Sequence, residues 1–284
     1  MGLGGFFKYD KPGPGVRKDA PKKKMFFVFL EIWSRNFFKL IPVNLVYTFM
    51  SLLFLPGGLA AAGMTNVARN LARDKHSFGL SDFFDTIRKN WKQALPAGII
   101  NNLITSVLSF AIFFYYMDII HDEGGFVSIA GMGLCVACFI VFSFMKYHFW
   151  LLVITFKLSL WKIYKNCFTF AFANLFPNLL ISLVNILVYG GTAFLIFCGI
   201  ITNILPWEIA WLPLLVMAMV YPGFTHIFTQ MMVFPKVKKL MIDPYYEAHP
   251  GEDVDLRRNL GLEIAEEEDE NLFDDEKSFT ENDE

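Results

Sequence analysis

Long stretches of this 284-residue sequence lack charged residues. Residues 126–145 and 175–207 contain none, and residues 95–120 contain only Asp118. A helix that crosses a bilayer needs about 20 apolar residues. Hydrophobic residues make up 55% of the chain and 32 of them are phenylalanine, far more than soluble proteins use. The sequence therefore predicts an integral membrane protein of the all-α class.

Sequence motifs of catalysis are also missing. The chain contains no HExxH, no GxSxG and no P-loop pattern. Its acidic C-terminal region lacks the spaced ligands and central glycine of an EF-hand calcium loop. We therefore expect no enzymatic activity, no cofactor and no bound metal.

Cysteine is scarce, with four residues in the chain. Cys135 and Cys138 form a CxxC pair, which in a soluble βαβ context indicates a redox motif or half of a metal site. Here the pair lies in an uncharged stretch, with no second pair and no histidine nearby. We expect thiols that only pack.

The apolar stretches predict a polytopic helical bundle with about five membrane-spanning helices. These are expected at residues 38–57, 95–116, 126–147, 175–198 and 209–233. Amphipathic stretches at residues 65–93 and 157–166 place aromatic and basic side chains at a membrane surface. The transmembrane domain is thus expected over residues 25–240. A basic tail rich in Pro and Gly, residues 1–24, precedes it, and a C-terminal tail, residues 241–284, follows it.

Charge is unevenly distributed along the chain. Residues 262–284 hold 12 of the 27 acidic residues, which predicts a solvated, disordered tail. The rest of the chain has 24 basic against 15 acidic residues. These basic residues are interleaved with the predicted spans and form no separate domain, so we expect no nucleic-acid partner.

Lysine and arginine in the loops predict the orientation. Residues 65–93 hold six, and residues 157–166 and 235–241 hold three each. The loops at residues 121–125 and 201–208 hold none. By the positive-inside rule, the amphipathic stretches and the C-terminus lie in the cytoplasm.

The basic N-terminal tail conflicts with this orientation if the first span crosses once. Either the tail lies outside, or the chain enters the membrane, breaks at residues 56–58, and returns as a short helix over residues 59–70. Pro and paired Gly break a helix, and the small residues that follow permit close helix packing. We favour the return, because it gives both features a role.

Polar side chains within the predicted spans are the first candidate site residues, because such groups are costly in a bilayer. They are Asn44, Asn101, Asn102, Lys146, His148, Asn178, Asn185 and His226. In the structural interpretation, the asparagines form hydrogen bonds between helices and Lys146 snorkels to the membrane interface. The functional one is a shared polar cavity, with the helix of Lys146 running on to Phe156.

The amphipathic stretches supply the second set of candidates, aromatic and basic residues at the membrane surface. They are Phe84, Arg88, Lys89, Trp91, Trp161 and Lys165. Such residues commonly anchor a helix at the interface. They would equally suit docking to a partner protein.

Four segments carry a family resemblance: FFKYDKPGPGV, LPGGLAAAGMTNVARNLARD, SDFFDTIRKNWKQA and DPYYEAHPGEDVDLRRNLGL. They resemble the YesL-like family of small bacterial integral membrane proteins, over most of the chain up to Leu262. LPGGLAAAG departs from the family's usual LPxxTxGPA. The resemblance implies a bacterial cell membrane, no catalytic residues, and an association with carbohydrate ABC transporters.

We therefore expect an accessory or assembly factor for a carbohydrate ABC importer, with permease or ATPase subunits as partners. One alternative is a transporter or channel with its own substrate path. That would require Lys146, His148 and the asparagines to line a shared cavity. A second alternative is a membrane-embedded sensor that acts through its tail.

Overall fold

The computed structural model describes residues 24–121, 125–202, 206–209 and 211–248, and these are helical with no strand among them. The predicted all-α class is confirmed. The basic tail up to residue 23 and the acidic stretch from residue 262 lie outside the described residues. By its contacts the chain forms two units, Met1–Phe234 and Pro235–Glu284.

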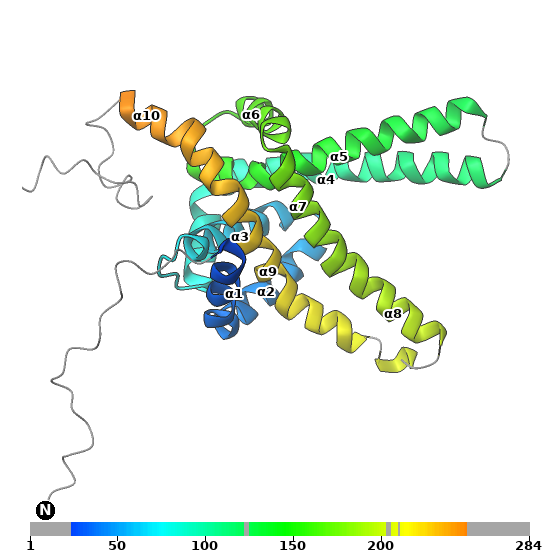
Figure 1. Ribbon diagram of the computed structural model, residues 1–284, viewed down its shortest axis with the longest axis horizontal. Helices are drawn as coiled ribbons and strands as arrows, with labels where there is room; N and C mark the ends of the chain where they lie inside the picture. Colours follow the sequence, from blue (N-terminus) through cyan, green and yellow to red (C-terminus); the bar gives the residue numbers. More distant parts are fainter. Residues whose placement is uncertain (1–23, 122–124, 203–205, 210, 249–284) are drawn as a thin grey trace, which may run out of the picture. The chain divides into compact units, whose positions relative to one another are not determined.

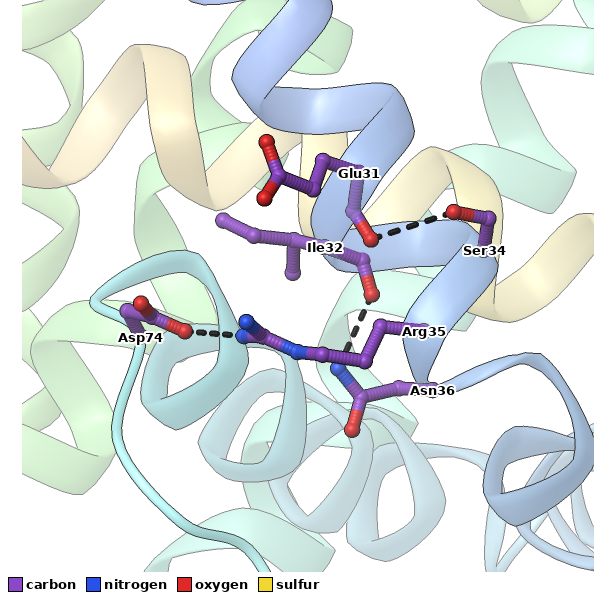
Figure 2. A network of polar contacts seen from close by, with 6 residues as sticks. All are labelled: Glu31, Ile32, Ser34, Arg35, Asn36 and Asp74. Atoms are coloured by element: carbon purple, nitrogen blue, oxygen red, sulfur yellow. Dashed lines mark hydrogen bonds and ion pairs between the residues drawn. The ribbon is translucent and has the colours of Figure 1, made fainter. Parts of the chain in front are cut away.

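The first two helices join at Asn36. Helix α1, Met25–Arg35, ends there, and α2, Phe37–Leu52, begins directly after it. The Asn36 side chain donates through Nδ2 to the Ile32 carbonyl over 2.8 Å, which satisfies an end carbonyl of α1 (Figure 2). At 16 residues, α2 is shorter than the predicted span of residues 38–57 and than the length a membrane crossing needs.

After a turn at residues 53–56 the chain folds back as α3, Gly57–Ala72. Two contacts link the segment around the start of α2 to the segment that follows α3. Lys39 Nζ donates to the Ser77 carbonyl over 2.9 Å, and Arg35 pairs with Asp74 (Figure 2). The structure therefore contains a helix directly after the Pro-Gly break, with its end near the end of α1.

Four helices of the described residues are long and apolar enough to cross a membrane. They are α4, Leu80–Ile120; α5, Phe126–Thr155; Leu175–Ile201, formed by α7, Leu175–Asn185, a π-helical segment, Ile186–Gly190, and α8, Gly191–Ile201; and Trp211–Tyr245, which contains α9, Trp211–Val237. At most 6% of the apolar window is buried in the first three, so lipid rather than a protein core must cover these surfaces.

Two helices are longer than the sequence predicts. Helix α4 joins the second half of the first amphipathic stretch to the second predicted span and continues through Pro96. Helix α5 runs beside α4 and continues to Thr155, so Lys146 lies inside the helix and not at its end (Figure 1). The shorter α6, Leu160–Ala173, covers the second amphipathic stretch from its fourth residue on and extends beyond it.

Helix α3 forms the centre of the first unit. Its side chains from Ala60 to Leu71 are mostly buried, and they pack with Phe29 of α1, Val43 of α2 and Phe83 of α4. Small residues make this possible, since α3 and α4 meet backbone to backbone at Gly58 and Gly98.

The second unit begins at Pro235 and contains the last turn of α9, a π-helical segment, Lys238–Ile242, and the short α10, Asp243–Ala248. Within it Lys238 Nζ lies 3.1 Å from an Asp243 carboxylate oxygen.

Candidate functional site

A cavity of about 180 Å³ lies among five helices of the first unit. Its walls come from α2, α3, α5, α7 and α9, so it forms only when the hairpin of α2 and α3 packs against the later helices. The lining residues are Tyr47, Ala61, Thr65, Lys146, Tyr147, Trp150, Asn185, Thr225, His226, Thr229 and Gln230.

The cavity carries one basic side chain of the lysine or arginine type, the half-buried Lys146. No acidic residue is among the lining residues, and no ion pair with Lys146 is present among the described residues. Helix α5 continues for nine residues beyond Lys146, about 13 Å of helix. Lys146 therefore lies within the helix and lines the cavity, whereas His148 and most of the candidate asparagines do not.

Gln230 supplies an unsatisfied acceptor. Its side chain is 2% exposed, and its Oε1 has no hydrogen-bond partner in the part of the chain that the structure describes. A buried amide oxygen without a donor is costly, which makes it a group that a ligand can satisfy.

The remaining polar groups of the cavity are largely engaged with their own helices. Thr65 donates to the Ala61 carbonyl over 2.7 Å, and Thr229 donates to the Thr225 carbonyl over 2.7 Å. His226 Nδ1 lies 2.9 Å from the Pro222 carbonyl. Because a carbonyl only accepts, Nδ1 carries the proton, and in the neutral ring Nε2 is left as an acceptor.

Aromatic rings complete the walls. Tyr47 packs edge-on against the His226 ring with 5.0 Å between centroids, and Tyr147 shares a 2.8 Å hydrogen bond with Ser182. Trp150 lies one turn after Lys146 on α5. The cavity therefore combines a cation, a few polar groups and apolar walls, the usual composition of a small-molecule site.

Of the candidate polar residues, the structure brings Lys146, Asn185 and His226 to the cavity and places the other five elsewhere. His148 is fully buried, stacks on Phe170 with 5.2 Å between centroids, and holds hydrogen bonds at both ring nitrogens. Asn174 donates to its Nε2 over 3.3 Å. His148 is thus a packing residue.

The other asparagines link helices or hold a turn. Asn44 donates to the Met219 carbonyl of α9 over 2.7 Å, and Asn101 accepts from Tyr164 of α6 over 2.9 Å. Asn102 donates over 2.9 Å to the Phe54 carbonyl in the turn before α3. Asn178 donates to the Ala171 carbonyl over 3.1 Å. These contacts are of the kind that joins helices within a bilayer.

Sequence reasoning missed Gln230 and the threonines of the cavity. A signal was present, because Tyr221, Thr225 and Thr229 recur every four residues on α9, and His226 and Gln230 each follow one of these threonines. These residues form a polar stripe on one face of an otherwise apolar helix.

The two amphipathic stretches come together at the surface. Gln93 Nε2 donates to the Leu158 carbonyl over 2.6 Å, which ties the first part of α4 to the start of α6. All six predicted docking residues are exposed, Trp161 by 80%; the others are Phe84, Arg88, Lys89, Trp91 and Lys165. We call these six residues the basic-aromatic face.

The CxxC pair has no metal-binding surroundings. Cys135 is half-buried and Cys138 exposed, and no group of three His, Cys, Asp or Glu side chains comes together among the described residues.

The fold and the cavity define a helical membrane protein with an internal polar pocket. A family model described as "Protein of unknown function, DUF624" matches residues 40–112, which comprise most of α2, all of α3 and most of α4. This match is consistent with the YesL-like resemblance. It includes Tyr47, Ala61 and Thr65 of the cavity, whereas Lys146 and Gln230 lie beyond it. No curated protein and no solved structure matches the chain.

Proposed function

We propose that this protein is a non-enzymatic membrane protein that binds a small anionic solute in the cavity between its helices, as the binding step of transport. The observation that carries the proposal is Lys146, a half-buried cation in a cavity without an acidic partner.

Electrostatics supports an anionic ligand. Taking an ammonium group out of water is costly unless an opposite charge compensates it. Ionisable residues within membrane helices are rare and commonly mark substrate paths. A carboxylate or phosphate beside Lys146 would supply the missing charge.

Gln230 further restricts the chemical class of the proposed ligand. Its buried Oε1 requires a hydrogen-bond donor, so the ligand should carry a hydroxyl or amino group as well as the anion. A cavity of about 180 Å³ holds a small solute, since one water takes about 30 Å³ of liquid volume.

Thermal unfolding in lipid nanodiscs tests this function. The probes are acetate, lactate, glucuronate and inorganic phosphate, with glucose as a neutral control. At least one anion should raise the Tm of the wild type, and the rise should disappear in Lys146→Met. Lys162→Met, which removes an exposed lysine of α6, is the matched control and should respond like the wild type.

Two results would count against the proposal. One is the absence of a Tm shift with every anion, and the other is an equal shift in Lys146→Met. For a bound anion, counterflow in proteoliposomes then tests whether binding leads to transport.

A second candidate function rests on the basic-aromatic face. Exposed Trp161 and Trp91 beside lysines and arginines suit docking to another membrane protein, because aromatic and arginine residues are enriched at interfaces. The proposed role is an accessory or assembly factor for a carbohydrate ABC importer in a bacterial cell membrane, with the C-terminus in the cytoplasm.

Affinity purification from native bacterial membranes tests the accessory role. Permease or ATPase subunits should copurify with the wild type and be lost in the double variant Trp161→Ala, Lys165→Ala. Trp211→Ala removes an exposed tryptophan outside this face and should retain them. Recovery of the chain alone in mild detergent would contradict this role.

A further inference from the structure

Two arginines lie one turn apart near the end of α3. Arg69 and Arg73 continue the face of α3 that carries Thr65, and both are half-buried. Arg69 donates through Nη1 to Thr155 Oγ1 over 3.1 Å and through Nη2 to Asn66 Oδ1 over 2.7 Å. The Arg73 guanidinium lies over the Phe234 ring, 4.9 Å from its centroid.

Neither arginine forms an ion pair with an acidic side chain of the described residues. Asp74 follows Arg73 directly in the sequence, but it pairs with Arg35 (Figure 2). Three nitrogens of the pair are buried without a hydrogen-bond partner, namely Arg69 Nε and both Nη atoms of Arg73.

The positive charges of Arg69, Arg73 and the neighbouring Lys75 repel one another. Burial and the charge of Arg73 lower the pKa of Arg69 to about 10, and burial lowers the pKa of Arg73. Burial and both arginines lower the pKa of Lys75. Arginine stays protonated at neutral pH, so the fold concentrates positive charge here at a cost.

Packing alone accounts for part of this arrangement. The carbonyl end of α3 favours a cation, and the ring of Phe234 favours the Arg73 guanidinium. Neither contact satisfies the buried N–H groups, because both Nη atoms of Arg73 lack a hydrogen-bond partner among the described residues although the guanidinium lies over the ring. The two Nη atoms of the Arg73 guanidinium are therefore left as hydrogen-bond donors for an oxyanion.

We infer that Arg69 and Arg73 bind a phosphate group, carried either by a lipid headgroup or by a soluble phosphate. Arginine forks match phosphate oxygens, and buried unpaired donors are the feature such a ligand satisfies. Thr155, which contacts Arg69, is the last residue of α5, so the arginine pair lies beside the end of a helix that is long and apolar enough to cross a membrane.

This site is separate from the cavity. Neither arginine lines the cavity, and neither Lys146 nor Gln230 contacts the arginine pair through any hydrogen bond among the described residues. If one of the two sites did not bind its proposed ligand, the proposal for the other site would still stand.

Delipidated full-length protein in maltoside detergent, which contains no phosphate, tests the site. The probes are dioleoyl phosphatidylglycerol, dioleoylglycerol with the same chains and no phosphate, and inorganic phosphate. Affinity is measured by native mass spectrometry for the lipids and from the Tm shift for phosphate. Phosphatidylglycerol should bind at least tenfold more tightly than dioleoylglycerol if the source is a lipid, and inorganic phosphate should raise the Tm if the source is soluble.

The double variant Arg69→Gln, Arg73→Gln should lose at least tenfold in affinity for whichever probe binds. Arg73→Lys keeps the charge but lacks the planar fork of the guanidinium. Its affinity for the probe should lie between those of the wild type and the double variant, which tests the site even if the double variant folds poorly. Lys162→Gln, at an exposed lysine of α6 outside the basic-aromatic face, is the control and should bind like the wild type. Binding of neither phosphate probe, or unchanged affinity in both Arg69→Gln, Arg73→Gln and Arg73→Lys, would overturn the inference.

Discussion

Gly58 and Gly98 lie backbone against backbone where α3 meets α4. A Cβ at Gly58 would stand 2.4 Å from the Cα of Gly98, and a Cβ at Gly98 would stand 2.5 Å from the Cα of Gly58. Both glycines fall within the stretch that matches the family model. The contact fixes the depth at which the return helix α3 sits among the other helices.

Gly98→Ala should therefore destabilise the protein, because the added methyl group meets backbone that cannot rotate away. Overpacking of this kind costs about 1–3 kcal/mol and sometimes more. Gly133→Ala on α5 is the control, since nothing lies within 4 Å of a Cβ there. Thermal unfolding in nanodiscs should show a lower Tm for Gly98→Ala only. Equal Tm values for Gly98→Ala and Gly133→Ala would mean that α3 and α4 move apart at this contact and accommodate the added methyl group without a loss of stability.

Tyr164→Phe should loosen α6 from α4. The hydroxyl is the hydrogen-bond donor to Asn101, whose side chain is 2% exposed and whose Nδ2 already lacks a partner. Removing one oxygen leaves the whole amide unsatisfied, at a cost of about 1–2 kcal/mol. Tyr116→Phe makes the same change at an exposed position and should be neutral. A similar unfolding free energy for both variants would show that the bond contributes nothing.

Cysteines at Ser34 and His76 should react with a membrane-impermeant maleimide from the same side. The pair of Arg35 with Asp74 holds these two segments together at one end of the hairpin (Figure 2). Both positions are exposed, and the background must lack the four native cysteines.

Gly125→Cys should react from the opposite side, because the 41 residues of α4 separate it from Leu80 by about 60 Å of helix. The positive-inside rule predicts that His76 is cytoplasmic. Labelling of Ser34 and His76 from opposite sides would exclude the return of the chain at the Pro-Gly break.

Lys146→Met should raise the Tm of the ligand-free protein while it abolishes anion binding. Removing a half-buried cation without an acidic partner relieves a desolvation cost, and we expect a gain of about 1 kcal/mol or more. Lys162→Met, at an exposed lysine, should stay within about 0.5 kcal/mol of the wild type. A large loss of stability in Lys146→Met would instead assign the lysine a structural role.

The candidate site was only partly predictable, and individual residues show why. Lys146 and His148 are two residues apart and look alike as polar groups in an apolar helix. Their positions on α5 differ by about 200° around the helix axis, so one reaches the cavity and the other packs on Phe170. The difference depends on which helices neighbour each face, and sequence spacing alone does not contain that information.

The sequence by itself determined the membrane class, because uncharged apolar stretches are stable only where lipid covers them. It also favoured a fold-back before α3, since Pro56 cannot continue a helix, and in the structure α2 ends at Leu52 and α3 begins at Gly57, directly after the proline. Only the tertiary structure decided which polar groups share a cavity and which arginines are left without acidic partners. Those properties depend on contacts between helices far apart in the chain, such as α3 with α5 and α2 with α9.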